Sequence, residues 1–257
     1  MRQLLIFIIA FFCTGNVYAD CAGNGLWVFP KGNTIKQNTI FIIEGYANSQ
    51  EIILQLNKKH DIYLKSGQQK IKLLVTETYV GQFHLTQAIL KPEKELKIGL
   101  EYTMHVDNLP EFEKFGKYNN ITEKYDLIKY KTLPENDHEK PNLSSKPKEI
   151  SKGLIHFGCG PSIEVVFTNP AKDKSEIVIK TTVKNLKTKK ETTYYIQPDG
   201  KKIVIGHGMC SGAFNFENGN NFEVEFSFMD ASGNSTVWAG QRIKFTKPTK
   251  ETDYHED

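Results

Sequence analysis

Apolar and polar residues alternate with a period of two in several segments of the C-terminal half. Residues 222–228 place an apolar side chain at every second position, and residues 177–183 do the same. A strand that is buried on one face shows this pattern. Residues 191–197 and 236–245 continue it, and turn-forming residues separate these segments. The pattern predicts antiparallel β-structure.

Shorter segments of the same kind occupy the N-terminal half. We expect strands at residues 38–46, 51–56, 71–75, 101–106 and 123–131. Helical stripes of useful length, with a period of 3.6 residues, do not occur in the sequence. Short strands separated by turns predict an all-β fold built from antiparallel sandwiches.

A stretch without this pattern divides the chain. Residues 134–152 contain three prolines and eight charged residues, a composition that buries no face and predicts a flexible linker. It separates a first sandwich domain at residues 20–133 from a second at residues 153–248. Residues 249–257 are expected to form a charged tail.

One motif occurs in both halves at the same offset. Its two copies consist of Leu96, Gly99 and Tyr102, and of Phe216, Gly219 and Phe222. The motif resembles the tyrosine corner of immunoglobulin-like (Ig-like) and fibronectin type III-like sandwiches, in which glycine makes the crossover and an aromatic residue opens the next strand. The resemblance implies two tandem Ig-like domains in an exported bacterial protein and no particular activity.

The two copies differ at their last position. Tyr102 is able to hydrogen-bond back to the backbone, whereas Phe222 has no hydroxyl and offers packing alone. The cysteine–tryptophan–cysteine core of antibody domains is also missing, because Trp27 and Trp238 lie near the expected first and last strands.

The N-terminus reads as a signal peptide. Arg2 precedes an apolar run at residues 4–12, and Val17-Tyr18-Ala19 fits a cleavage site after Ala19. The run is far shorter than the ~20 residues needed to cross a bilayer, and no later stretch qualifies. We therefore expect an exported protein, periplasmic or secreted, with residues 1–19 removed and no membrane span in the mature chain.

Composition excludes two classes of protein. A charged fraction of 25% and an aromatic fraction of 11% exclude a wholly disordered chain. The net charge of +3 is too small to predict a nucleic-acid-binding protein from charge alone.

The mature chain keeps three cysteines, Cys21, Cys159 and Cys210. An exported chain meets an oxidising environment, so one disulfide is expected. We predict the pair Cys159–Cys210, because both residues lie in the C-terminal half, and place Cys21 on a loose terminus.

The same region offers a metal site as an alternative. His156 and Cys159, like His207 and Cys210, are three residues apart. Two imidazoles and two thiolates would complete a tetrahedral zinc site, and Met209 alongside would suit copper. A disulfide would consume both thiolates, and for an exported chain we favour the disulfide over the metal.

Cys210 also lies in a Gly-x-Cys-x-Gly sequence at residues 208–212, which matches a nucleophile elbow with cysteine in place of serine. Such an elbow opens into a helix, whereas these residues run into a turn, so a structural cystine is preferred to a cysteine hydrolase. Asp230 and Asn234 flank a turn with oxygen ligands for calcium, but the fuller acidic loop is missing and turn formation is preferred.

The leading functional hypothesis is a non-catalytic protein without a cofactor. The sequence contains no recognisable triad and no phosphate loop, and sandwiches of this kind act through edges, loops and interdomain surfaces. We expect an extracytoplasmic binding or scaffold protein that contacts another protein or a cell-surface polymer, with no nucleic acid involved. Metal binding and cysteine hydrolysis remain the second and third hypotheses.

Overall fold

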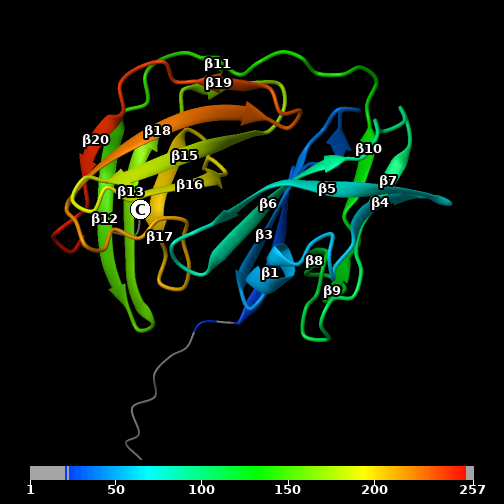
Figure 1. Ribbon diagram of the computed structural model, residues 1–257, viewed down its shortest axis with the longest axis horizontal. Helices are drawn as coiled ribbons and strands as arrows, with labels where there is room; N and C mark the ends of the chain where they lie inside the picture. Colours follow the sequence, from blue (N-terminus) through cyan, green and yellow to red (C-terminus); the bar gives the residue numbers. More distant parts are fainter. Residues whose placement is uncertain (1–20, 22, 253–257) are drawn as a thin grey trace, which may run out of the picture.

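The computed structural model describes Cys21 and residues 23–252, and almost all of their regular structure is β (Figure 1). The expected signal peptide at residues 1–19 and the end of the tail at residues 253–257 lie outside the described residues. Within the described part, α2 (Gln50–Leu54) is the only helix. None of the described helices is long and apolar enough to cross a membrane.

Eight strands of the N-terminal half, the first unit, form one continuous sheet. Their order is β1-β3-β6-β5-β4-β7-β10-β2, and only β2 runs parallel to its neighbour, β10. The strands are β1 (Asn24–Phe29), β2 (Thr34–Ile35), β3 (Phe41–Ala47), β4 (Ile62–Ser66), β5 (Gln69–Val80), β6 (Leu85–Pro92), β7 (Glu101–Val106) and β10 (Lys129–Thr132). The short β8 (Lys117–Asn119) and β9 (Lys124–Asp126) form a separate hairpin.

Strand β5 lets this sheet fold over on itself. Its first half pairs with β4 and its second half with β6, and the register shifts between Val75 and Glu77. A bulge of this kind bends a strand. Alternate residues from all eight strands consequently meet in one buried core, which includes Phe41, Tyr102 and Tyr130.

The expected strand at residues 51–56 is wrong, because most of it forms α2 and the turn that follows. Ile52 and Ile53 are buried while Leu54 is exposed, and a five-residue helix is too short to reveal its period in the sequence. Gly45 on β3 makes room for the helix. A Cβ there would lie 2.7 Å from Ile53 Cγ1.

The C-terminal half, the second unit, has two main sheets, ordered β12-β13-β17 and β16-β15-β18, with β19 and β20 both paired to β18. A small pair, β11-β14, accompanies them. The strands are β11 (Asn142–Leu143), β12 (Glu149–Phe157), β13 (Gly160–Thr168), β14 (Ala171–Lys172), β15 (Ile177–Asn185), β16 (Glu191–Ile196), β17 (Lys202–His207), β18 (Asn221–Asp230), β19 (Ser235–Val237) and β20 (Ile243–Thr246).

Aromatic side chains fill the core of the second unit. Phe222, Phe226 and Phe228 point inward from β18, as the period of two predicts, and contact the opposite sheet through Phe167 on β13. The predicted strand at residues 236–245 is divided into β19 and β20. The last described residues lie along β12, where Thr252 N donates to Leu154 O at 2.9 Å.

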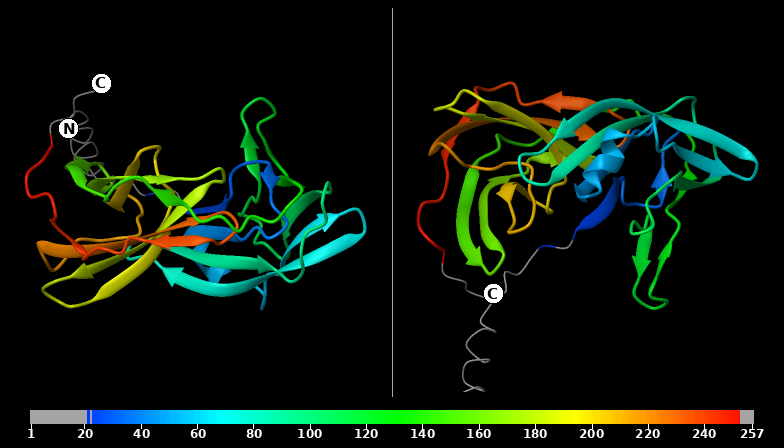
Figure 2. Two further views of the ribbon diagram at one scale, coloured as in Figure 1. Left: turned by 90° about the horizontal axis from the view of Figure 1, so that it is seen from above. Right: turned by 60° about the horizontal axis from the view of Figure 1, so that its bottom comes forward.

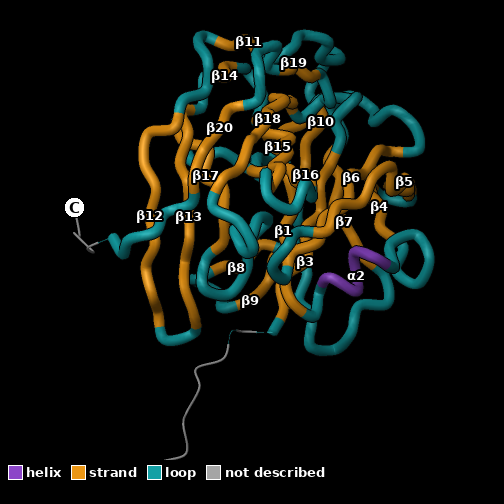
Figure 3. The backbone as a smooth tube through the Cα atoms, turned by 60° about the vertical axis from the view of Figure 1, so that its left-hand side comes forward, coloured by secondary structure: helices purple, strands orange, loops and turns teal. Residues whose placement is uncertain are grey.

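A third buried cluster joins the two units. Phe29, Ile42 and Ile89 come from the first unit, and Val178, Tyr195, Met229 and Ala231 come from the second. On β3, Phe41 and Ile43 face the first core, so Ile42 between them faces outward and is covered by the second unit. The tube in Figure 3 shows the strands of both units packed into one body.

Residues 134–152, predicted as a flexible linker, are bound to both units and contain β11 and the start of β12. Asp137 N donates to Asn38 Oδ1 at 3.1 Å in the first unit, and Asn234 Nδ2 of the second unit donates to Asp137 O at 3.0 Å. Thr236 Oγ1 donates to Pro141 O at 2.6 Å. Figure 1 shows the segment crossing from one unit to the other. Side chains of both units satisfy its backbone polar groups, which no composition rule anticipates.

Candidate functional site

The two copies of the Gly-centred motif lie at equivalent places, before β7 and before β18. Leu96 and Tyr102 are fully buried, and Gly99 has a φ of +73°. The Tyr102 hydroxyl accepts a hydrogen bond from Lys97 N at 3.1 Å. In the second copy Phe216 and Phe222 pack against each other with ring centroids 5.0 Å apart, next to Gly219. Four of the six residues, Leu96, Tyr102, Phe216 and Phe222, thus belong to the buried cores of the two units.

The predicted Cys159–Cys210 disulfide is wrong. Cys210 pairs with Cys21, with 5.6 Å between their Cα atoms, and Cys159 is a free, partly buried thiol. Cys21 precedes β1 of the first unit, and Cys210 lies in the segment that follows β17 of the second unit. The disulfide therefore links the N-terminus of the first unit to a loop of the second.

This pairing also removes the alternative metal site at His156, Cys159, His207 and Cys210, since Cys210 has no thiolate to offer. His156 Nδ1 instead contacts Glu251 Oε1 at 2.6 Å, and the His207 ring packs 5.1 Å from the ring of Phe83. The nucleophile predicted for a cysteine hydrolase is lost in the same way, and β17 is followed by a loop and β18 without a helix.

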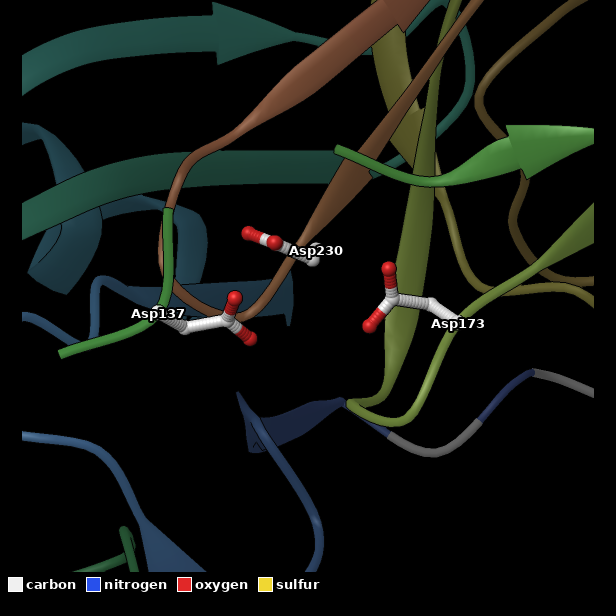
Figure 4. Close-up of side chains that lie close together, drawn as sticks. All are labelled: Asp137, Asp173 and Asp230. Atoms are coloured by element: carbon white, nitrogen blue, oxygen red, sulfur yellow. The ribbon is translucent and has the colours of Figure 1, made fainter. Parts of the chain in front are cut away.

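A cluster of carboxylates lies where three segments meet. Asp230 ends β18, Asp173 follows β14 and Asp137 belongs to the connecting segment; oxygens of the three lie within 4.8 Å of one another (Figure 4). No other group of three potential ligands this close occurs among residues 21 and 23–252. The sequence identified the turn at 230–234, whereas the fold supplies the other two carboxylates.

Hydrogen bonds from the protein already satisfy this cluster. Asp230 Oδ1 accepts from Ser232 N at 2.8 Å and from Asn234 N at 2.9 Å, and its Oδ2 accepts from Asn234 Nδ2 at 2.8 Å. Burial raises the pKa of Asp230, and the negative charge of Asp137 adds to the increase. Calcium takes roughly six to eight oxygens, whereas this cluster offers three carboxylates. Each of them already accepts a backbone N–H of its own turn, so the cluster is explained as a contact between three chain segments.

Two polar pairs fix the contact between the units. The buried Gln87 side chain is hydrogen-bonded twice to the backbone of Tyr195: Tyr195 N donates to Gln87 Oε1 at 2.7 Å, and Gln87 Nε2 donates to Tyr195 O at 3.1 Å. The Tyr194 hydroxyl donates to Glu44 Oε2 at 2.8 Å. Burial raises the pKa of Glu44, and this hydrogen bond partly offsets the increase.

Beside these pairs the two units enclose a pocket of about 440 Å³, which we call the interdomain pocket. Its floor is the outer face of β1, β3 and β6, with Trp27, Glu44 and Gln87, and its opposite wall includes Gln197 and Ser211 of the second unit. Sequence patterns do not indicate this pocket, because its walls come from different halves of the chain.

A second candidate surface surrounds the β8–β9 hairpin, which stands away from the body of the molecule (Figure 2). A groove of about 680 Å³ separates the hairpin from β1. Four large apolar side chains that are about half exposed line this groove: Trp27, Phe112, Tyr118 and Tyr125. Ile121, between β8 and β9, is 94% exposed, and Leu127, directly after β9, is about half exposed. We call these six residues the hairpin surface.

Comparisons with known proteins identify no family. No family model matches the chain, and no curated protein matches it. The chain is similar to a pullulanase type I from Bacillus subtilis str. 168 complexed with maltose, with 10% identity and a TM-score of 0.25 over 88% of this chain and 25% of that chain. Similarity to the N-terminal part of the bacterial S-layer protein SbsC has 13% identity and a TM-score of 0.24, over 88% of this chain and 43% of that one.

The adhesin InvE from Yersinia pseudotuberculosis has 11% identity and a TM-score of 0.22, over 87% of this chain and 58% of that one. The chain thus spans less than two thirds of each of these three structures. With TM-scores of 0.25 and below, these similarities carry no argument about activity or partners.

Proposed function

We propose that this protein is an exported, non-catalytic binding protein made of two Ig-like sandwiches, and that it binds another protein through the hairpin surface. The Cys21–Cys210 disulfide supports export, because such bonds persist in oxidising compartments. The same bond supports a non-catalytic role, since it occupies the nucleophile of the elbow-like sequence.

Strand order supports the Ig-like assignment. In the first unit β1-β3-β6-β5 corresponds to one sheet of an Ig-like sandwich and β4-β7-β10 to the other. In the second unit β12-β13-β17 faces β16-β15-β18-β20, an arrangement similar to that of fibronectin type III domains. The buried Tyr102 hydroxyl, which accepts a hydrogen bond from the backbone five residues earlier, resembles the tyrosine-corner contact of Ig-like domains and supports this part of the proposal.

The observation that carries the binding role is the exposure of the hairpin surface. Tyr118 and Tyr125 lie opposite each other across the hairpin, with ring centroids 5.3 Å apart, and both remain about half exposed. Aromatic side chains of this kind are enriched in protein interfaces and carry much of their binding energy. Exposed apolar patches on a soluble protein commonly mark such sites.

Charge and hydrogen bonding indicate what the partner offers. Among the described strands β1 pairs with β3 alone, and the groove lies along β1, so this edge is available to an added strand. Lys31, Lys114 and Lys117 line the groove, whereas its only lining carboxylate, Glu113, is buried and bonded to Ser49. We therefore infer a partner protein that places an extended acidic segment beside β1.

A photo-crosslinking experiment tests this proposal. A benzoylphenylalanine at position 118 should crosslink the mature protein to one protein of its own envelope fraction. The matched control is the same residue at Val237, which is equally exposed on the second unit. The crosslink should weaken with salt, because charge contributes to the contact, and should disappear in Tyr125→Ser.

Equal crosslinking at positions 118 and 237, or a crosslink that salt strengthens, would contradict the proposal. Recovery of a polysaccharide in place of a protein would also contradict it.

A further inference from the structure

The proposed protein-binding role leaves most of the interdomain pocket unused, because only Trp27 and Lys31 among the residues named for that role also line this pocket. It lies between the outer face of the first unit and β16, β17 and the segment that follows β17. A volume of about 440 Å³ is within the range of small-molecule sites. The disulfide at Cys210 anchors the segment that contributes Ser211 and Phe214, so this wall is held in place.

Three floor residues form a row across neighbouring strands. Trp27 on β1 lies directly opposite Glu44 on β3, and Glu44 lies directly opposite Gln87 on β6. Directly paired residues project from the same face of a sheet. The indole, the carboxylate and the amide consequently lie side by side, facing the second unit.

Trp27 provides a flat apolar surface. Its indole lies close to Gly25, where a Cβ would be 2.9 Å from the ring, and its centroid is 6.2 Å from that of Tyr46. Glycine at position 25 thus leaves room for the indole in this orientation. The side chain nevertheless remains 48% exposed, which leaves ring surface available to a ligand.

Glu44 provides an acceptor that the protein does not fully use. Its Oε2 accepts from the Tyr194 hydroxyl and, at 3.5 Å, from Gln87 Nε2. Its Oε1 accepts no hydrogen bond from the described residues, and no Lys or Arg of the described chain forms a salt bridge with it. Burial raises the pKa of this carboxylate, and the through-space effect of Lys31, at the pocket wall, offsets only part of that increase.

The remaining polar side chains of the pocket include one donor-only group, the Lys31 ammonium, and two groups that both donate and accept. The Lys31 ammonium, the Gln197 amide and the Ser211 hydroxyl line it, and the described residues give these groups no hydrogen-bond partner. One negative and one positive charge leave the lining without net charge. A lining of this kind favours a neutral ligand that has both donors and acceptors over an ion of either sign.

We propose that the interdomain pocket binds a neutral saccharide, with a pyranose ring on Trp27 and hydroxyl groups bonded to Glu44 and Lys31. A sugar hydroxyl both donates and accepts, so it suits a carboxylate oxygen next to an ammonium group. The C–H face of the ring suits the indole. This site goes beyond the proposed protein binding, since Glu44, Gln87 and the second-unit wall are not part of the hairpin surface or its groove.

Tryptophan fluorescence tests the proposal directly. The chain has two tryptophans, so Trp238→Phe leaves Trp27 as the only one, and this background is titrated with the methyl pyranosides of glucose, galactose, mannose and N-acetylglucosamine and with their disaccharides. Choline chloride and sodium acetate serve as the cationic and anionic probes. We expect a saturable change with at least one neutral sugar and with neither salt.

The variant Glu44→Gln should weaken sugar binding about tenfold or more, because hydrogen bonds to a charged group contribute about 1.5–3 kcal/mol. Glu101→Gln, at an exposed salt bridge with Lys129, is the matched control and should bind normally. Thermal unfolding and circular dichroism of each variant establish that the fold is retained.

Three results would overturn the proposal: saturation with choline or acetate alone, saturation with no member of the panel, or full affinity in Glu44→Gln. The variant Tyr125→Ser separates this site from the hairpin surface. With the crosslinker at position 118 it should lose the protein crosslink, and without the crosslinker it should keep the sugar response, so either proposal can fail while the other stands.

Discussion

Replacing Cys21 by serine should remove a large part of the stability of the folded chain. The Cys21–Cys210 bond joins residues separated by 189 positions. In the chain-entropy description, closing a loop of this length lowers the entropy of the unfolded chain by about 18 cal/mol/K, or about 5 kcal/mol at 25 °C. This stabilisation of about 5 kcal/mol applies in full when both units unfold together. The apolar cluster that the two units share favours such joint unfolding.

Guanidinium unfolding followed by circular dichroism measures this loss. With an unfolding slope of about 5 kcal/mol/M for a chain of this size, the midpoint should fall by about 1 M. Cys159→Ser is the matched control, because Cys159 is a free thiol and its replacement breaks no disulfide. Cys210→Ser should behave like Cys21→Ser, and reduction of the wild type should reproduce both.

Equal guanidinium midpoints for Cys21→Ser and Cys159→Ser would show that the Cys21–Cys210 bond does not stabilise the folded chain. A lower midpoint for Cys159→Ser alone would indicate that Cys159, and not Cys21, is the disulfide partner of Cys210.

Three further predictions concern the packing of the units and the pocket. Gln87→Leu should lower the free energy of unfolding, measured in urea, by about 2–4 kcal/mol, because it leaves the backbone N–H and C=O of Tyr195 unpaired. The control Gln68→Leu, on an exposed turn, should change it little. Burial raises the pKa of Glu44 above 4.5, so its stabilising contribution is complete below pH 4.5 and is lost as pH rises through the pKa of the folded state. As pH rises above 4.5, the unfolding free energy of Glu44→Gln should therefore fall less than that of the wild type. An equal fall would refute the raised pKa of Glu44. Gly206→Ala should lower the free energy of unfolding by about 2–4 kcal/mol in the same assay, because φ is +140° and a Cβ would lie 2.0 Å from Ile163 O. The control is Gly67→Ala, which has open space around it and should lower this free energy by about 1 kcal/mol.

Local patterns were sufficient wherever one side of a strand faces a core. The alternation at residues 222–228 correctly indicates which side chains of β18 are buried, because a strand repeats every two residues. The same reasoning failed at residues 51–56. Ile52, Ile53 and Leu56 are buried there at helical spacing, and one turn of helix contains too few residues to show a period.

Partners that lie far apart in the sequence were beyond this reasoning. Residues 134–152 look like a linker because they are charged and rich in proline, but Asn38, Asn234 and Thr236 hydrogen-bond to their backbone from both units. The turn at Asp230 was recognisable from its residues, whereas the carboxylates of Asp137 and Asp173 beside it were not.

The amino-acid sequence alone established β-structure, one motif repeated in both halves and the expectation of an oxidised cysteine pair, because these depend on neighbouring residues and on the export that the N-terminal pattern predicts. Only the tertiary structure decided that Cys210 bonds to Cys21, that the two units share a buried contact and that Trp27, Glu44 and Ser211 line one pocket. Strand periodicity determines the direction of each side chain, but the way two sheets pack determines which distant side chains it meets.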